Sequence, residues 1–449
     1  MAKSAVVEAN GHHTTTANNQ CNNNAIPKDP AIGPAQLENH KILFLNLRYR
    51  GDDAETSNAS ATALIQKLRP DWGSEIDFRR FTDGITNTLL QARPRHAEPL
   101  PGESQDDARD REAILLRAYG NGTDLIIDRN REAQNHELLS RHRLAPELLA
   151  LFENGMLYRF IRGRVTAPQD LRRPEIYRAV ARRLAQWHST IPCLPMPKKQ
   201  QQAQSTTNGG QTRIDEMVPG KLQPNVWTVM QKWILALPTE TSAQRERQTS
   251  LQKELDRVVA EFGQRPGLGH DGLVFAHCDL LSGNVIVLPK PAATAKSPAA
   301  ANSADVSVTF IDYEYATPSP AAFDLANHFA EWGGFDCDFS VLPTRAQRRE
   351  FIREYIRVYF GNGGGDEDDH EDAAEDLFAE VDVYRGLPGF YWGIWALIQA
   401  TISTIDFDYA SYAETRLGEY WAWRAEQDGS RVKEGREMPL RERRWAQEE

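Results

Sequence analysis

The sequence predicts an α+β fold with a β-rich N-terminal lobe and a mainly helical C-terminal lobe. Between residues 38 and 160, short runs that are apolar, or that alternate apolar and polar residues, recur around one helical segment. After residue 163, apolar residues recur at intervals of three and four, which is typical of helices that bury one face. A chain of 449 residues with 40% apolar content can bury the cores of two lobes.

The N-terminal lobe is predicted from its strand-like runs. An Asn-Gly pair at 121–122 predicts a hairpin turn into a further strand. The predicted strands are 43–48, 76–81, 88–90, 113–119, 125–128, 148–152 and 156–160, and the predicted helices are 61–68 and 131–141.

The C-terminal lobe is predicted from amphipathic segments that surround one hairpin. The helical segments are 175–188, 226–237 and 251–262, and the two strands are 285–288 and 308–312.

Composition divides the chain further. Residues 1–37 contain almost no large apolar residue, so we expect a disordered tail there. The N-lobe is expected over 38–160 and the C-lobe over 161–449. Stretches rich in Pro, Gly or charge are predicted to be surface insertions, at about 91–111, 195–215, 289–305 and 361–376.

Charge and cysteine usage exclude some classes of protein. The net charge of -11 leaves no basic stripe for nucleic acid, so no nucleic-acid partner is expected. None of the four cysteines has the spacing of a metal or redox motif, which predicts reduced thiols in a cytoplasmic protein. No apolar run is long enough to cross a bilayer, so we expect no membrane span.

The first chemical motif is residues 277–284, which read His-Cys-Asp-Leu-Leu-Ser-Gly-Asn. In phosphoryl transfer, an Asp such as Asp279 orients a hydroxyl and accepts its proton, and an Asn five positions later, Asn284, helps to hold magnesium. The hairpin that follows would bring Asn284 close to Asp312 at the end of its second strand. An ordinary apolar hairpin with polar ends is the alternative interpretation.

Two further features suit phosphate binding. Arg117 is a lone cation in a nearly continuous apolar strand, and a buried cation needs an anion; the alternative is an edge-strand Arg with its head in solvent. The turn formed by Asp83, Gly84, Ile85, Thr86 and Asn87 presents N–H groups and hydroxyls between two strands, although an ordinary hairpin turn explains it as well.

With these motifs in order, the chain resembles the choline/ethanolamine kinase family, which has the bilobal protein-kinase-like fold. The resemblance covers about residues 41–421 and is carried by 81–87, 115–120, 277–284, 310–315, 323–332 and 391–399. The Asp-Gly-Ile-Thr-Asn turn and residues 403–409 are more similar to ethanolamine kinases than to choline kinases. The insertions are longer than in compact family members.

The resemblance implies roles for the motif residues. Asp279 would be the catalytic base, and Asn284 and Asp312 would bind Mg²⁺. Glu314 would be an additional carboxylate at the metal or, equally, a structural ion pair. Arg117, oriented by Glu132, would contact ATP phosphates that residues 83–87 cover. His277 would brace the loop.

The resemblance also implies a pocket for an ammonium group. Glu331, Trp392, Trp395 and Tyr412 are similar in placement to residues that line this pocket, and Tyr315 joins them. Without the resemblance, the two tryptophans, three apart on one helix face, would be interpreted as core packing.

The implied activity is ATP- and Mg²⁺-dependent phosphorylation of ethanolamine to phosphoethanolamine, the first step of the CDP-ethanolamine route to phosphatidylethanolamine. The alternatives are a choline kinase or a dual choline/ethanolamine kinase and, in another class, a catalytically silent kinase-like binding module. The substrates would be ethanolamine or choline together with ATP.

Overall fold

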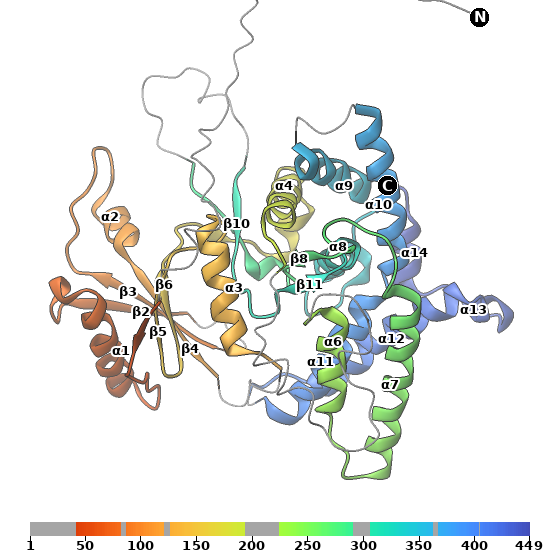
Figure 1. The fold of residues 1–449 in the computed structure, drawn as a ribbon, viewed down its shortest axis with the longest axis horizontal. Helices are drawn as coiled ribbons and strands as arrows, with labels where there is room; N and C mark the ends of the chain where they lie inside the picture. The colour runs from red at the N-terminus through yellow and green to blue at the C-terminus, as the bar shows by residue number, and fades with distance from the viewer. Residues whose placement is uncertain are drawn as a thin grey trace, which may run out of the picture. The chain divides into compact units, whose positions relative to one another are not determined.

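The structure, a computed structural model, describes residues 42–81, 87–120, 126–193, 224–290, 306–361, 367–403 and 405–449. Residues 43–449 form one compact unit. A six-stranded sheet with three helices lies at one end of this unit, and the helical part lies at the other (Figure 1). The predicted α+β architecture, with a β-rich N-lobe and a mainly helical C-lobe, is confirmed.

The N-lobe sheet has the strand order β1-β5-β6-β4-β3-β2. Every neighbouring pair is antiparallel except β1 and β5, which run parallel. The order places β4, which carries Arg117, inside the sheet between β3 and β6. The strands are β1 (Leu43–Leu45), β2 (Ile76–Phe81), β3 (Asn87–Pro94), β4 (Ile114–Tyr119), β5 (Leu148–Phe152) and β6 (Gly155–Arg159).

Three helices accompany this sheet: α1 (Ala54–Leu68), α2 (Gln105–Glu112) and α3 (Arg129–Arg141). Helix α1 packs Leu64 and Ile65 into the sheet's own apolar cluster. Helix α3 instead contributes Leu138 and Leu139 to the large cluster of the helical lobe. Helix α3 also contacts β5, so it stands where the sheet meets the rest of the chain (Figure 1).

The helical lobe contains two small sheets. Strands β9 (Val285–Val287) and β10 (Val308–Phe310) form the predicted antiparallel hairpin, and β7 (Arg164–Val165) joins it on the β9 side. Strands β8 (Val274–Ala276) and β11 (Thr317–Ser319) pair separately. The residues between β8 and β9, and those between β10 and β11, are the motif segments 277–284 and 311–316.

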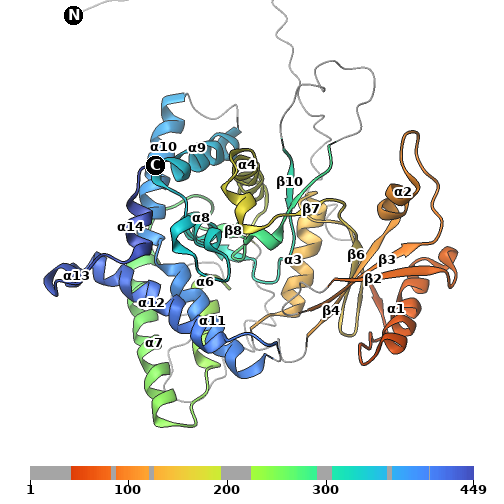
Figure 2. The ribbon, with the colours of Figure 1, turned by 180° about the vertical axis from the view of Figure 1, so that it is seen from behind.

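Helices surround these sheets. Helices α11 and α12 pack closely along each other. Figure 2 shows these two helices and their neighbours from behind. The bounds are α4 (Pro174–Thr190), α6 (Val226–Leu235), α7 (Ser242–Phe262), α8 (Ala321–Ala330), α9 (Arg345–Phe360), α10 (Glu367–Tyr384), α11 (Leu387–Ile402), α12 (Tyr409–Gln427), α13 (Ser430–Lys433) and α14 (Leu440–Ala446).

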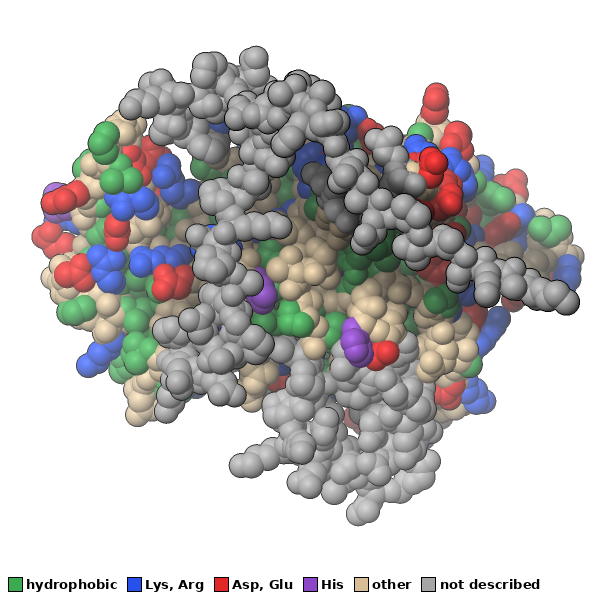
Figure 3. All heavy atoms as spheres, turned by 45° about the horizontal axis from the view of Figure 1, so that its top comes forward, with side chains coloured by type: hydrophobic (Ala, Val, Ile, Leu, Met, Phe, Trp, Pro, Cys, Tyr) green, Lys and Arg blue, Asp and Glu red, His purple; other side chains and the backbone are tan. Residues whose placement is uncertain are grey.

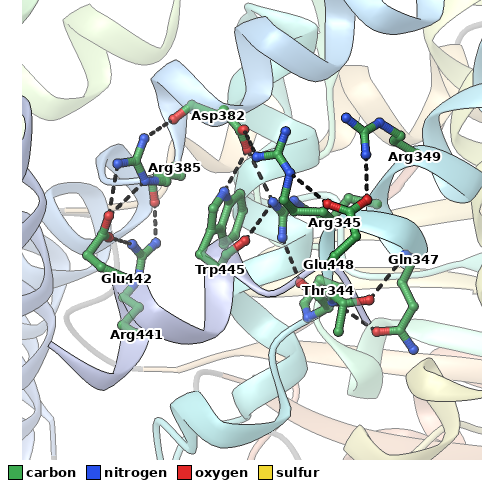
Figure 4. Close-up of polar contacts among 12 residues, drawn as sticks. Thr344, Arg345, Gln347, Arg349, Asp382, Arg385, Arg441, Glu442, Trp445 and Glu448 are labelled. Atoms are coloured by element: carbon green, nitrogen blue, oxygen red, sulfur yellow. Dashed lines mark hydrogen bonds and ion pairs between the residues drawn. The ribbon is translucent and has the colours of Figure 1, made fainter. Parts of the chain in front are cut away.

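The C-terminal residues are held against the start of α9. Backbone N–H groups of Arg345 and Ala346 donate to the carbonyls of Gln447 and Glu448 at 2.8 and 3.0 Å. Figure 4 shows the polar contacts of this junction, where Trp445 Nε1 also donates to Asp382 at 2.7 Å. The first-turn N–H groups of α9, which lack partners within the helix, thus find carbonyls about a hundred residues later.

Three local predictions were wrong. Residues 126–128 are not a strand, and Asp128 instead caps α3 by accepting from Arg131 N at 3.1 Å. The supposed insertion at 91–111 contains the end of β3 and most of α2. The supposed loop at 361–376 includes the first half of α10, whose Glu371 accepts from Arg353 Nε on α9 at 2.9 Å. Most of the insertions predicted at 195–215 and 289–305, and the tail 1–37, lie outside the described residues.

On the face shown in Figure 3, cationic and acidic side chains are interspersed over the left and right parts, whereas the visible centre is mainly hydrophobic or uncharged. Within the described parts of the chain, no helix combines the length and the apolar character that crossing a bilayer requires. Cys193, Cys278 and Cys337 all carry free thiols.

Candidate functional site

A cavity of about 320 Å³ lies where the sheet, segments 277–284 and 311–316, and the helical lobe meet. Its apolar lining comes mainly from the sheet, from the residues that follow it and from the β9–β10 hairpin. These residues are Phe81, Leu89, Leu115, Phe160, Ile161, Val165, Ile286 and Ile311. The remaining lining includes the predicted site residues Arg117, Asp279, Asn284, Asp312, Glu314, Tyr315, Glu331, Trp392, Trp395 and Tyr412. One cavity therefore brings together predicted site residues that lie up to 295 positions apart in the chain, from Arg117 to Tyr412.

The backbone before Asp279 is held in an unusual conformation. Cys278 has a φ of 62°, a region that non-glycine residues rarely occupy. The buried carboxylate of Asp324 on α8 accepts from the backbone N–H groups of His277 and Cys278 at 3.0 and 2.7 Å. Asn327, one turn later, donates to the carbonyl of Cys278 at 2.9 Å. Side chains of helix α8 thus bind both the N–H group and the carbonyl of Cys278, the residue with the unusual φ.

His277 supports the same segment as a neutral ring. Its Nε2 lies 3.0 Å from the carbonyl of Ile311, so Nε2 carries the proton. Its Nδ1 then accepts from the backbone N–H of Asp279 at 3.3 Å. Burial lowers the pKa of His277 to about 4, which keeps this pattern intact at neutral pH. These contacts are consistent with the predicted bracing role.

Asp279 is buried and is held by Asn284. The amide Nδ2 of Asn284 donates to Asp279 Oδ2 at 3.0 Å and to the Asp279 carbonyl at 2.7 Å. Burial, together with the negative charges of Asp312, Glu331 and Glu314, raises the pKa of Asp279 well above its usual range. The carboxyl is therefore poised to accept a proton more readily than an exposed aspartate.

Arg117 lies among three carboxylates. Its Nη2 is 2.7 Å from Asp312 Oδ1 and 3.4 Å from Glu132 Oε1, and it also contacts Glu314. The predicted pairing with Glu132 is present, and Glu137, farther along α3, pairs with Arg141. The buried strand cation has anionic partners, as its sequence context predicts.

Glu314 is enclosed by donors. Asn87 Nδ2 donates to its Oε2 at 3.1 Å, and Arg129 Nη1 lies 3.3 Å from the same oxygen. Arg129 also lies 2.9 Å from Glu132 and stacks over Tyr119 at 4.3 Å. These contacts favour the ion-pair interpretation of Glu314 over the metal interpretation. Arg129 was missed, because nothing in the sequence near it distinguishes it from other helix-start arginines.

The oxygen-bearing side chains suit a hard cation. Asp312 has a φ of 67°, and its side chain, which lines the cavity, is 30% exposed. Asn284 lies directly before β9, and its backbone carbonyl accepts a hydrogen bond from Ile311 N. No group of three or more His, Cys, Asp or Glu residues able to hold an ion was found in the described ranges. Magnesium needs only one or two protein carboxylates when phosphate oxygens and water complete its shell, so Asp312 and Asn284 fit it.

Aromatic residues from α11 form a second wall. Trp395 Nε1 donates to the hydroxyl of Tyr315 at 2.8 Å, and Trp392 Nε1 donates to Asn327 Oδ1 at 2.8 Å. The two indoles are perpendicular at 5.4 Å, and Tyr315 meets Trp392 edge-on at 5.7 Å. Hydrogen bonds at both ring nitrogens fix the orientation of these faces.

Glu331 and Tyr412 complete this part of the cavity. Glu331 begins a 3-10 turn after α8, and its Oε1 accepts from Arg416 Nη2 at 3.0 Å. Phe335, which was not predicted, also lines the cavity and packs against Tyr412 at 5.9 Å. Of the predicted phosphate turn, Asp83, Gly84, Ile85 and Thr86 lie outside the described residues, and Asn87 lies at the start of β3.

Comparison with known proteins agrees with this geometry. The chain is 30% identical to mouse ethanolamine kinase 1 over 400 residues, which cover 86% of this chain and 94% of that protein. It is 31% identical to human ethanolamine kinase 1, with coverage of 88% and 78%, and 34% identical to the Drosophila melanogaster ethanolamine kinase, with coverage of 82% and 77%.

Solved structures agree on the fold. A Plasmodium vivax ethanolamine kinase matches with a TM-score of 0.59 at 23% identity, covering 82% of this chain and 89% of that one. A Cryptosporidium parvum choline kinase matches with a TM-score of 0.53 at 19% identity, covering 84% and 96%. The family model described as choline/ethanolamine kinase matches residues 78–421, well over half of the chain. The chain therefore belongs to the choline/ethanolamine kinase family.

Proposed function

We propose that this chain is an ATP- and Mg²⁺-dependent ethanolamine kinase that produces phosphoethanolamine. The observation that carries the proposal is the single cavity that holds Asp279, a poised base, together with Glu331 and the aromatic wall. A small amino alcohol needs both: a base for its hydroxyl and an anionic, aromatic environment for its ammonium. The curated ethanolamine kinases similar to this chain support the same acceptor.

On the nucleotide side, the apolar lining around Phe160 and Ile161 suits an adenine ring. Arg117 would contact the phosphates with its guanidinium, oriented by Glu132. Asp312 and Asn284 would hold Mg²⁺, which supplies charge neutralisation on the phosphate oxygens. The proposed catalysis rests mainly on positioning and electrostatics, because phosphoryl transfer asks little covalent chemistry of the protein.

On the acceptor side, Asp279 would accept the hydroxyl proton while Asn284 keeps its carboxylate in place. Glu331 would accept hydrogen bonds from the ammonium, and Trp392, Trp395 and Tyr412 would present ring faces to it. A primary ammonium donates three hydrogen bonds, whereas a quaternary one donates none, so Glu331 offers more to ethanolamine than to choline.

Binding of the amino alcohol would also affect the protonation state of Asp279, the proposed base. The negative charges of Asp312 and Glu331 help to raise the pKa of Asp279. An ammonium beside Glu331 would offset part of that field and lower the pKa of Asp279, which favours the ionised form that a general base needs. We place the enzyme in the cytoplasm, at the first step of the CDP-ethanolamine route, and the free thiols support a reducing compartment.

The test is a comparison of turnover with ethanolamine and with choline at matched concentrations, with ATP and Mg²⁺ supplied. We expect a higher kcat/KM for ethanolamine. A preference for choline would reject the acceptor assignment, and no turnover of either alcohol would support a silent binding module.

The variant Asp279→Asn tests the proposed role of Asp279 as the base. Its amide oxygen can still accept a hydrogen bond from Asn284, but the amide cannot take up the proton of the substrate hydroxyl. We expect this variant to bind ATP with unchanged affinity and to lose turnover by about 10²-fold or more. Undiminished turnover would remove Asp279 from the role of base.

A further inference from the structure

A row of buried side chains with alternating charge leads from the cavity to helix α14. Its first members are Glu331, which lines the cavity, and Arg416 and Glu419 on α12. It continues through Arg441 and Glu442 on α14 and ends at Arg385, as the labelled side chains of Figure 4 show. Every side chain in the row is at most 13% exposed.

The contacts along the row are close. Glu331 Oε1 lies 3.0 Å from Arg416 Nη2, and Arg416 Nη1 lies 3.7 Å from Glu419 Oε1. Glu419 Oε2 lies 3.4 Å from Arg441 Nε, and Arg441 Nη1 lies 2.9 Å from Glu442 Oε1. The row contains as many cations as anions, so it carries no net charge when all its members are ionised.

The first pair sets the state of Glu331. Burial raises the pKa of Glu331, and Arg416 opposes this shift. Burial alone would lower the pKa of Arg416. Its interactions with Glu419, Tyr412 and Glu331 outweigh burial and raise this pKa above its usual value, so Arg416 keeps its charge. Asp279, Cys337 and Tyr412 also interact electrostatically with Glu331.

We propose that Arg416 is a positioning residue that fixes the Glu331 carboxylate as an ionised, oriented acceptor and thereby sets the preference for a primary ammonium. This proposal rests on the ethanolamine assignment above. A carboxylate already paired with a guanidinium gives little net attraction to a bare positive charge. It still accepts directional hydrogen bonds, which only an ammonium bearing N–H groups can donate. The acceptor pocket therefore selects for N–H donors rather than for charge alone.

The decisive variant is Arg416→Met, which removes the guanidinium while keeping an apolar chain of similar length. Glu331 then loses its partner, and the pKa of its carboxyl, already raised by burial, rises further because Arg416 no longer opposes that shift. We expect the KM for ethanolamine to rise about tenfold, the loss of roughly one charge-assisted hydrogen bond. The KM for choline should rise less, the KM for ATP should not change, and Arg416→Lys should restore part of the loss.

The matched control is Arg424→Met on the same helix. Arg424 is also buried and ion-paired, with Glu254 at 2.9 Å and Glu261 at 2.6 Å, but these partners, unlike Glu331, do not line the cavity. If Arg416 serves stability alone, both variants will lose stability and neither will change the ethanolamine KM selectively. That result would overturn the proposal.

A second variant, Glu419→Gln, should shift the pH dependence of kcat/KM in the direction opposite to that of Arg416→Met. Glu419 raises the pKa of Glu331, so Glu419→Gln should strengthen the hold of Arg416 on Glu331. The acid limb of kcat/KM for ethanolamine should move to lower pH in Glu419→Gln and to higher pH in Arg416→Met. Shifts in the same direction, or none, would overturn the proposal even if Arg416→Met folds poorly. Wild-type protein that fails to phosphorylate ethanolamine would instead reject the proposed function itself.

Discussion

The substitution His136→Gln tests how buried neutral histidines make the stability of this fold depend on pH. His136 on α3 is fully enclosed, its Nε2 lies 2.9 Å from the carbonyl of Pro146, and its ring packs on Tyr158 and Tyr313. Burial lowers its pKa from 6.5 to about 4. Because the unfolded chain then binds the proton more readily than the folded one, His136 destabilises the folded protein as the pH falls from about 6.5 to about 4.

The size of the effect follows from these two values. At pH 5 a single histidine of this kind lowers the free energy of unfolding by about 2 kcal/mol relative to pH 7.5. Carboxyls with raised pKa values, such as Asp279, act in the opposite direction, so the pH curve of the wild type alone does not isolate the histidine. A glutamine amide can donate to Pro146 as the ring does but does not titrate, and the packing loss that it causes does not depend on pH.

The assay is urea unfolding of wild type and His136→Gln at pH 7.5 and pH 5.0, followed by both fluorescence and circular dichroism. We expect the stability advantage of the wild type to shrink by about 2 kcal/mol at the lower pH. Leu139→Ala on the same helix is the control, since it opens a buried cavity without removing a titrating group. An advantage that is equal at both pH values for His136→Gln would refute the reasoning.

Three further predictions concern the site. Because burial raises the pKa of Asp279, its ionisation costs stability increasingly as the pH rises above about 4, so Asp279→Asn should melt at a higher temperature than wild type at pH 8. Arg117→Lys keeps the charge but loses the forked guanidinium, and isothermal titration should show ATP affinity reduced about tenfold. In Gly389→Ala, the new Cβ would lie 2.5 Å from the carbonyl of Arg416, so α11 and α12 must separate at a cost of about 1–3 kcal/mol in urea unfolding. Gly418→Ala, where a Cβ meets nothing within 4 Å, is the control and should not destabilise.

The residues that the sequence predicted are those with a local signature. Asp279 and Asn284 lie five apart in one segment, and Arg117 is a lone cation in an apolar strand. Arg129 and Arg416 carry no such signature, because their contacts to the site come from residues 185 and 85 positions away. Asp324 lies in the motif 323–332, but nothing there indicates its contact with a residue 46 positions earlier. Distant pairing of this kind is created by folding and leaves no mark near either residue.

The wrong local predictions have the same origin. The apolar run before Asp128 resembles a strand, yet the carbonyl of Ile126 accepts from the buried indole of Trp233 at 3.2 Å, and the side chain joins the helical lobe's core. The polar stretch after Gln91 resembles a loop, yet Gln91 is buried and donates to Asp110 of α2 at 3.0 Å. Tertiary contacts override the composition in both places.

The junction between the last residues and helix α9 couples opening at the start of α9 to detachment of the C-terminal residues. The first backbone amides of a helix ordinarily exchange their protons with solvent through fraying. Here the amides of Arg345 and Ala346 are bonded to the carbonyls of Gln447 and Glu448, so their exchange requires the C-terminal residues to detach first. Hydrogen exchange of these two amides thus reports whether α14 opens alone or together with the helical lobe.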